Sequence, residues 1–73
     1  MKDRKIVTAE KLLSTYTDQT LGLKAETFVD INGNFGTRFF KDNVWQLDEI
    51  YEGHSEEYAE NAAENYVMEI KTL

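Results

Sequence analysis

The chain has 73 residues, with 14 acidic against 8 basic side chains and a formal charge of −6. This length predicts one small domain spanning residues 1–73 and excludes a multidomain enzyme or a large cofactor fold. The chain has no cysteine, which excludes a disulfide scaffold and a thiolate metal site. No apolar run approaches the ~20 residues of a membrane span, and no signal-peptide pattern follows the charged N-terminus. We therefore expect a cytoplasmic protein.

The first predicted element is a short helix at about residues 8–16. Thr8 is a suitable cap, Glu10 suits the first turn, and an apolar stripe follows at Leu12, Leu13 and Tyr16. The next residues, 17–24, are predicted to form a connector.

Three strands are expected next, at about residues 24–31, 34–41 and 44–51. Asn32-Gly33 predicts a tight hairpin turn in which both residues take positive φ, and a second turn is expected at 41–43. The second strand alternates, with Phe39 on one face and Arg38 and Phe40 on the other. In the third strand the alternation groups Trp45 with Leu47 and places Asp48 on the opposite face.

A long amphipathic helix is predicted at about residues 55–71, capped by Ser55 and stabilised at its positive end by Glu56 and Glu57. The predicted fold class is therefore α+β, a single small domain in which helices pack on one face of a three-stranded antiparallel sheet, in the order α-β-β-β-α.

The segment from Gly53 to Ala63 resembles the last helix of double-stranded RNA-binding domains, with Ser55, Ala59, Ala62 and Ala63 at the structural positions. The resemblance implies the same α-β-β-β-α fold. However, the phosphate-binding lysines of that family fall on Glu56, Glu57 and Glu60, and carboxylates at these positions repel RNA. Residues 58–67 are also similar to the C-terminal helix of small uncharacterised tailed-phage proteins, which implies an accessory protein acting in the host cytoplasm.

Acidic residues concentrate in the C-terminal half of the chain. Residues 1–24 carry a net charge of +2 and residues 25–73 a net charge of −8, and no base occurs between Asp48 and Glu69. On a helix, side chains four residues apart lie about 6 Å apart on one face. The candidate partner-binding residues are Glu56, Glu57, Glu60, Glu64, Asp48, Glu49 and Glu52.

These charges favour a non-enzymatic protein that docks on a basic surface of a host protein, in one form as a nucleic-acid mimic or inhibitor. The alternative for the same residues is a solvated face that keeps a small domain soluble. A second hypothesis is a nucleic-acid-binding domain that uses Arg38, Lys41 and the basic N-terminus (Lys2, Arg4 and Lys5). A third is a small structural or self-assembling protein, for example a homodimer that pairs this N-terminus with the acidic face of a second copy.

Catalytic, metal and cofactor sites are not expected. Asp30-Ile31-Asn32-Gly33-Asn34 resembles the start of a calcium loop, but the sixth position is Phe35 and the twelfth is Lys41. His54 is the only histidine and stands in a predicted loop. Arg38, Phe40 and Trp45 can be read as a basic and aromatic surface for single-stranded nucleic acid or, alternatively, as core residues and a lone surface charge.

Overall fold

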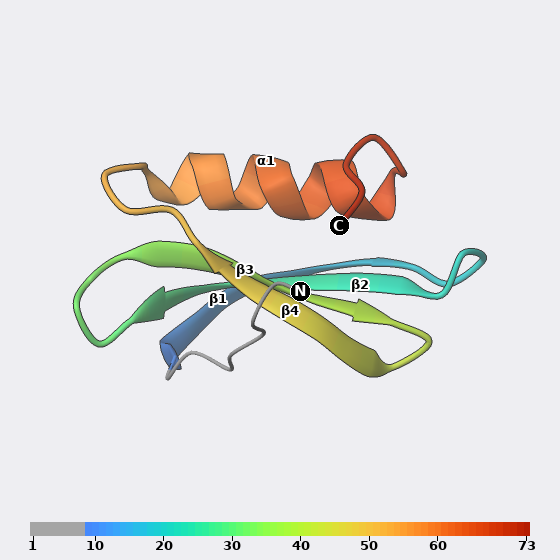
Figure 1. Cartoon of the computed structure of the whole chain (residues 1–73), viewed down its shortest axis with the longest axis horizontal. Helices are drawn as coiled ribbons and strands as arrows, with labels where there is room; N and C mark the ends of the chain where they lie inside the picture. The colour runs from blue at the N-terminus through green and yellow to red at the C-terminus, as the bar shows by residue number, and fades with distance from the viewer. Residues whose placement is uncertain (1–8) are drawn as a thin grey trace.

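Four consecutive antiparallel strands make up most of the described chain, and one helix follows them (Figure 1). The computed structural model describes residues 9–73. The strands are β1 (Ala9–Asp18), β2 (Leu23–Asp30), β3 (Phe35–Lys41) and β4 (Val44–Ile50), and they lie in the sheet in chain order. The helix, α1 (Glu56–Val67), covers one face of the sheet above β1, β2 and β3. The class is α+β as expected, but the order is β-β-β-β-α.

The predicted first helix is wrong, because its described part, from Ala9 onward, is the edge strand β1. Its register against β2 shifts twice, between Ala9 and Lys11 and between Leu12 and Ser14. Each β-bulge adds one residue and breaks the alternation of faces. As a result, apolar residues fall at helix-like spacing in a segment that is extended. The expected cap at Thr8 lies outside the described residues.

The turn between β2 and β3 is longer than the two-residue turn predicted at Asn32-Gly33. The Gly33 N–H donates to the Asp30 carbonyl (3.0 Å), and Gly33 takes φ +82° whereas Asn32 does not take positive φ. The Asp30 carboxylate accepts hydrogen bonds from the backbone N–H groups of Asn32 and Asn34, both at 2.9 Å. The side chain that began the calcium-like pattern therefore holds a hairpin loop together.

The core lies between the sheet and α1. Phe39, Ala25 and Ala63 are fully buried there, and the Phe39 and Tyr66 rings meet edge to face with centroids 4.8 Å apart. Towards the start of α1 the same layer is polar, because Thr27 and Thr37 are also fully buried. Thr27 hydrogen-bonds Ser14 across the strands, and Thr37 donates to the Ala59 carbonyl at 2.9 Å. These bonds satisfy the hydroxyl groups that α1 removes from water.

Gly36 has a defined place on the face of the sheet that points away from α1. It lies in register between Phe28 and Ile50, and a Cβ atom added there would lie 2.5 Å from the Glu49 carbonyl oxygen and 2.8 Å from the Phe28 ring. The aromatic ring therefore occupies the space that a side chain at position 36 needs.

We expect Gly36→Ala to lower the free energy of unfolding by about 1–3 kcal/mol, because a backbone oxygen cannot move aside cheaply. Urea denaturation followed by circular dichroism measures this change. Gly33→Asn is the matched control, since position 33 has open space and asparagine tolerates positive φ. Equal stability losses in the two variants would contradict the steric explanation.

Candidate functional site

The solvent side of α1 carries the acidic residues that the sequence singled out. Ser55 caps the helix by accepting a hydrogen bond from the Tyr58 N–H (3.4 Å), and Glu56 and Glu57 occupy the first turn as predicted. The helix ends at Val67, earlier than expected, because Glu69 takes φ +61° and the N–H groups of residues 70 and 71 turn back to the Asn65 carbonyl. The helix therefore has 12 residues.

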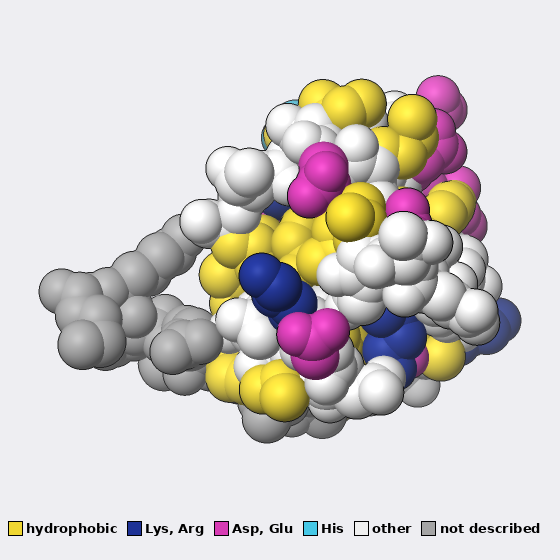
Figure 2. Space-filling view, turned by 90° about the vertical axis from the view of Figure 1, so that its right-hand side faces the viewer, with side chains coloured by type: hydrophobic (Ala, Val, Ile, Leu, Met, Phe, Trp, Pro, Cys, Tyr) yellow, Lys and Arg dark blue, Asp and Glu magenta, His cyan; other side chains and the backbone are white. Residues whose placement is uncertain are grey.

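Four glutamates lie along one flank of α1, and we call them the acidic flank: Glu56, Glu57, Glu60 and Glu64. All are exposed except Glu60, which is partly exposed. At 100° per residue they fall within a quarter to a third of the helix circumference, on the side opposite Tyr58. Figure 2 shows acidic side chains gathered along the upper right edge of the helix layer. Within residues 9–73, the ion pairs of the structure involve other carboxylates than these four.

The crowding of carboxyl groups within the acidic flank affects Glu60 in particular. A hydrogen bond between the Glu60 and Glu56 side chains raises the pKa of Glu60 above its ordinary value, and desolvation and the charges of Glu56 and Glu57 add to the shift. A raised carboxyl pKa means that ionising the group destabilises the folded state. The flank therefore carries charge that the described part of the fold does not neutralise.

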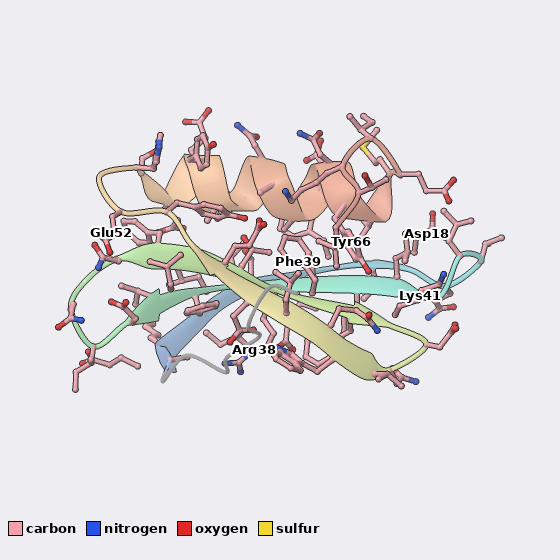
Figure 3. All side chains as sticks on the ribbon, in the orientation of Figure 1. Asp18, Arg38, Phe39, Lys41, Glu52 and Tyr66 are labelled. Carbon is pink, nitrogen blue, oxygen red and sulfur yellow. The ribbon has the colours of Figure 1, made fainter. Side chains whose placement is uncertain are left out.

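The structure removes Asp48 from the predicted acidic surface. Its side chain is fully buried on the face of the sheet away from α1. The Arg38 guanidinium donates to it twice, from Nε to Oδ1 and from Nη2 to Oδ2, each at 2.9 Å, and Trp45 Nε1 also donates to Oδ1 at 2.9 Å. The hydrogen bond to Asp48 raises the pKa of Arg38. The structure thus places Asp48 apart from the helix glutamates, on the face of the sheet where Figure 3 labels its partner Arg38.

Glu49 is also internally paired, although it lies on the helix side of the sheet. Lys71 Nζ is 3.2 Å from its Oε1, and the Tyr51 hydroxyl donates to the same oxygen at 2.7 Å. Burial, followed by the nearby Glu49 carboxylate, raises the pKa of Tyr51. By contrast, Glu52 is exposed in the loop that leads to α1. The predicted set of seven is thus divided into two neutralised carboxylates and five exposed or partly exposed ones.

The sequence did not single out Tyr58, which the structure places at the N-terminal end of α1. Its side chain is 46% exposed, its ring stacks on His54 with centroids 3.9 Å apart, and it meets Tyr51 edge to face at 5.1 Å. The arrangement assigns His54 to aromatic packing.

The structure does not bring Arg38 and Lys41, the described residues of the predicted nucleic-acid-binding surface, close together. Arg38 points away from α1 and is engaged by Asp48, whereas Lys41 lies at the end of β3 beside the hairpin turn. The N-terminal bases lie outside the described residues. Arg38, Phe40 and Trp45 do share one face, because the β3–β4 register pairs Phe40 with Trp45 and Arg38 with Asp48. A bulge at Gln46 puts Trp45 on the face opposite to Leu47, which corrects the predicted alternation.

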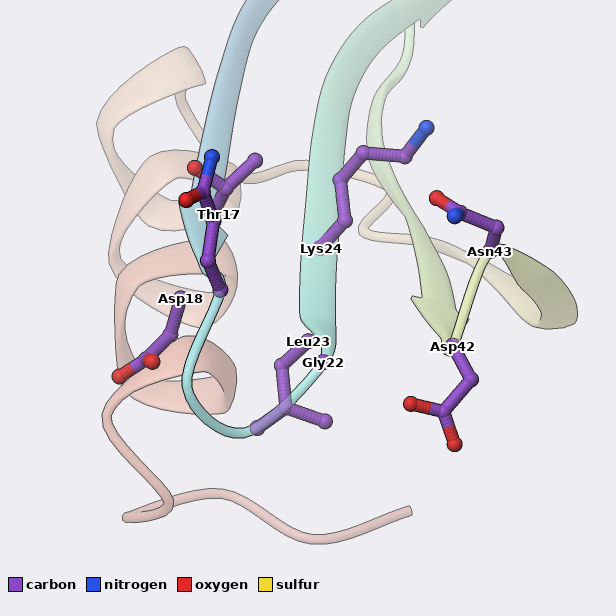
Figure 4. A pocket seen from close by; sticks show the side chains of 8 residues that line it. Thr17, Asp18, Gly22, Leu23, Lys24, Asp42 and Asn43 are labelled. Atoms are coloured by element: carbon purple, nitrogen blue, oxygen red, sulfur yellow. The ribbon is translucent and has the colours of Figure 1, made fainter.

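A shallow pocket of about 500 Å³ lies between the two hairpin turns that join β1 to β2 and β3 to β4 (Figure 4). Asp18 and Asp42 line it, but Asp18 already accepts a hydrogen bond from the Leu21 N–H (3.2 Å). Gly22 takes φ +70°, and its carbonyl accepts from the Asp42 N–H at 2.7 Å. No group of three metal-binding side chains occurs in residues 9–73. We therefore interpret the pocket as the space between two hairpin turns that hydrogen-bond each other.

No protein-family model, curated protein or solved structure matches this chain. Over the described range, no helix has both the length and the apolar character needed to cross a bilayer.

Replacing Asp48 tests the buried ion pair. We expect Asp48→Ala to lower the free energy of unfolding by about 1–3 kcal/mol, because Arg38 and the Trp45 indole each lose a hydrogen-bond partner. Urea denaturation monitored by Trp45 fluorescence measures the loss. Glu52→Ala removes the same charge from an exposed loop position and should leave stability within about 0.5 kcal/mol of the original. Equal effects would contradict the pairing.

The raised pKa of Glu60 gives a pH-dependent prediction. We expect Glu60→Gln to stabilise the protein at pH 7, because the amide replaces a carboxyl group whose pKa is raised in the folded protein. This gain in stability should fade as the pH drops through the raised pKa of Glu60 in the folded protein. It should vanish below the pKa of about 4.3 in the unfolded chain, because Glu60 is then neutral in both the folded and the unfolded state. Thermal unfolding between pH 3 and pH 8 measures it, and a gain that stays constant with pH would refute the repulsion.

Proposed function

We propose that this protein is a non-enzymatic binding protein that docks its acidic flank on a basic surface of another protein. The observation that carries the proposal is the unneutralised charge on one side of α1. Four glutamates are presented there, and within residues 9–73 the cations near carboxylates pair elsewhere, Arg38 with Asp48 and Lys71 with Glu49. A partner that supplies cations relieves the repulsion of Glu60 by the charges of Glu56 and Glu57.

Exposed apolar side chains near both ends of α1 support a protein partner. Tyr58 is 46% exposed at the start of the helix, and Met68 and Ile70 are 58% and 67% exposed just after its end. Aromatic and methionine side chains are enriched in protein–protein interfaces and anchor them. A partner surface that combines lysine or arginine with apolar contacts suits this arrangement.

The spacing of the flank also suits a nucleic-acid mimic. Glu56, Glu60 and Glu64 repeat every four residues, which sets carboxylates about 6 Å apart along one line. This spacing resembles that of phosphates along a nucleic-acid strand. In this form of the proposal, the protein is a phage accessory protein in the host cytoplasm that occupies the cationic groove of a nucleic-acid-binding host protein. Binding to nucleic acid itself has less support, because Arg38 is already engaged by Asp48.

The triple variant Glu56→Gln, Glu60→Gln, Glu64→Gln tests the proposal. We expect it to fold and to bind an immobilised arginine-rich peptide at least about tenfold more weakly at low salt, since each lost ion contact weakens association. The original chain should elute as salt rises. Biolayer interferometry over a salt series measures both effects.

The matched control changes the same number of charges away from the flank: Glu10→Gln, Asp42→Asn and Glu69→Gln. These positions are exposed, and none belongs to the acidic flank. Affinity in the control should stay within a few-fold of the original. Equal weakening in both triple variants indicates that net charge alone drives binding and removes the proposal.

A further inference from the structure

The face of the sheet that points away from α1, here called the underside, has no described element packed on it. It carries Leu12, which is 55% exposed, and the partly exposed side chains of Phe40, Trp45 and Ile50. A sheet in a soluble domain usually buries one face and shows polar residues on the other. Aromatic residues on the second face are instead typical of an interface.

The charges of the two central rows of the underside, Lys24, Glu26, Arg38 and Asp48, sum to zero, in contrast to the acidic flank. Two rows cross the sheet in register. In one row Glu26 lies beside Arg38, which lies beside Asp48. In the next row Lys24 lies beside Phe40, which lies beside Trp45, and Lys24 Nζ stands 4.3 Å from the centre of the Phe40 ring. Lys24 and Glu26 are two residues apart on β2, so both side chains point to the same face.

We propose that the underside binds a second copy of this chain, with the two sheets packed face to face about a two-fold axis. An axis that runs across the strands between the two rows places β2 of one copy against β2 of the other. Lys24 of each copy then faces Glu26 of its partner, and Arg38 faces the Phe40 ring. A two-fold interface must be self-complementary in this way, because every contact between one residue and a second residue of the partner occurs twice, once in each direction.

The size of the face is consistent with this dimer. The molecule measures 34 × 27 × 19 Å, and Figure 1 looks along the shortest axis, so the underside spans about 34 × 19 Å, or roughly 650 Å². Stable interfaces bury about 800 Å² of accessible surface on each partner, and a rough surface exceeds its flat footprint. The two sheets fit the aligned packing of a β-sandwich, about 10 Å apart.

Electrostatics favour the underside over the helix side for self-association. Contact between two helix sides brings two sets of unneutralised glutamates together. Contact between undersides places the two α1 helices on opposite outer surfaces with both sheets between them. That separation exceeds the Debye length of about 8 Å at physiological ionic strength, so the repulsion is screened. The acidic flanks remain free, and this inference does not depend on the proposed function.

A charge exchange tests the dimer. Analytical ultracentrifugation of the full chain should show a species of twice the 8.5 kDa monomer mass at micromolar concentration. Lys24→Glu and Glu26→Lys each place like charges opposite one another, and each should weaken dimerisation at least about tenfold. A mixture of the two variants should regain the dimer, since every facing pair then has opposite charges. No defect within a single copy predicts this rescue.

Lys11→Glu is the control for Lys24→Glu, because it makes the same charge change on an exposed residue of the helix-side face. It should remain dimeric. A monomer at all concentrations of the original chain overturns the inference, and so does a dimer that both single variants retain. Failure of the two variants to recombine also overturns it, provided circular dichroism shows that each is folded. None of these results changes the expected behaviour of the acidic flank.

Discussion

The close approach of α1 to the sheet fixes where every other group lies. Ala59 and Ala63 are fully buried, so the helix backbone comes near enough for the Thr37 hydroxyl to bond the Ala59 carbonyl at 2.9 Å. The Tyr66 hydroxyl also donates to the Phe40 carbonyl at 3.0 Å. Together these two hydrogen bonds set the rotation of the helix about its axis. Because the rotation is fixed, the glutamates cannot turn toward the sheet.

Within residues 9–73, α1 covers one face of the sheet only, so the two sides of this part of the molecule differ in electrostatic character. On the helix side the carboxylates outnumber the cations, and those of the acidic flank repel one another. On the underside Asp48 is fully buried but receives three hydrogen bonds from Arg38 and Trp45, so the Arg38–Asp48 pair carries no net charge. An unneutralised surface suits a partner of opposite charge, whereas a paired surface suits a copy of itself. The two proposed interactions therefore use different faces.

Local patterns predicted much of the fold because the forces involved act within a few residues. The local sequence predicted the Ser55 cap, the acidic first turn of α1 and the alternation of β3. The first element was misread because two bulges in β1 put Leu12 and Leu13 at consecutive positions without a helix. The same effect at Gln46 separated Trp45 from Leu47. A bulge depends on pairing with another strand, so no pattern within the strand itself reveals it.

The sequence by itself determined the excess of acid in the C-terminal half and its spacing along a helix, because charge and periodicity are properties of neighbouring residues. Only the tertiary structure decided which carboxylates stay charged toward solvent. Asp48 and Glu49 are adjacent in the chain but point to opposite faces of β4, where one meets Arg38 and the other meets Lys71. Neutralisation requires a cation from a distant segment, and strand register and helix position alone bring that segment near.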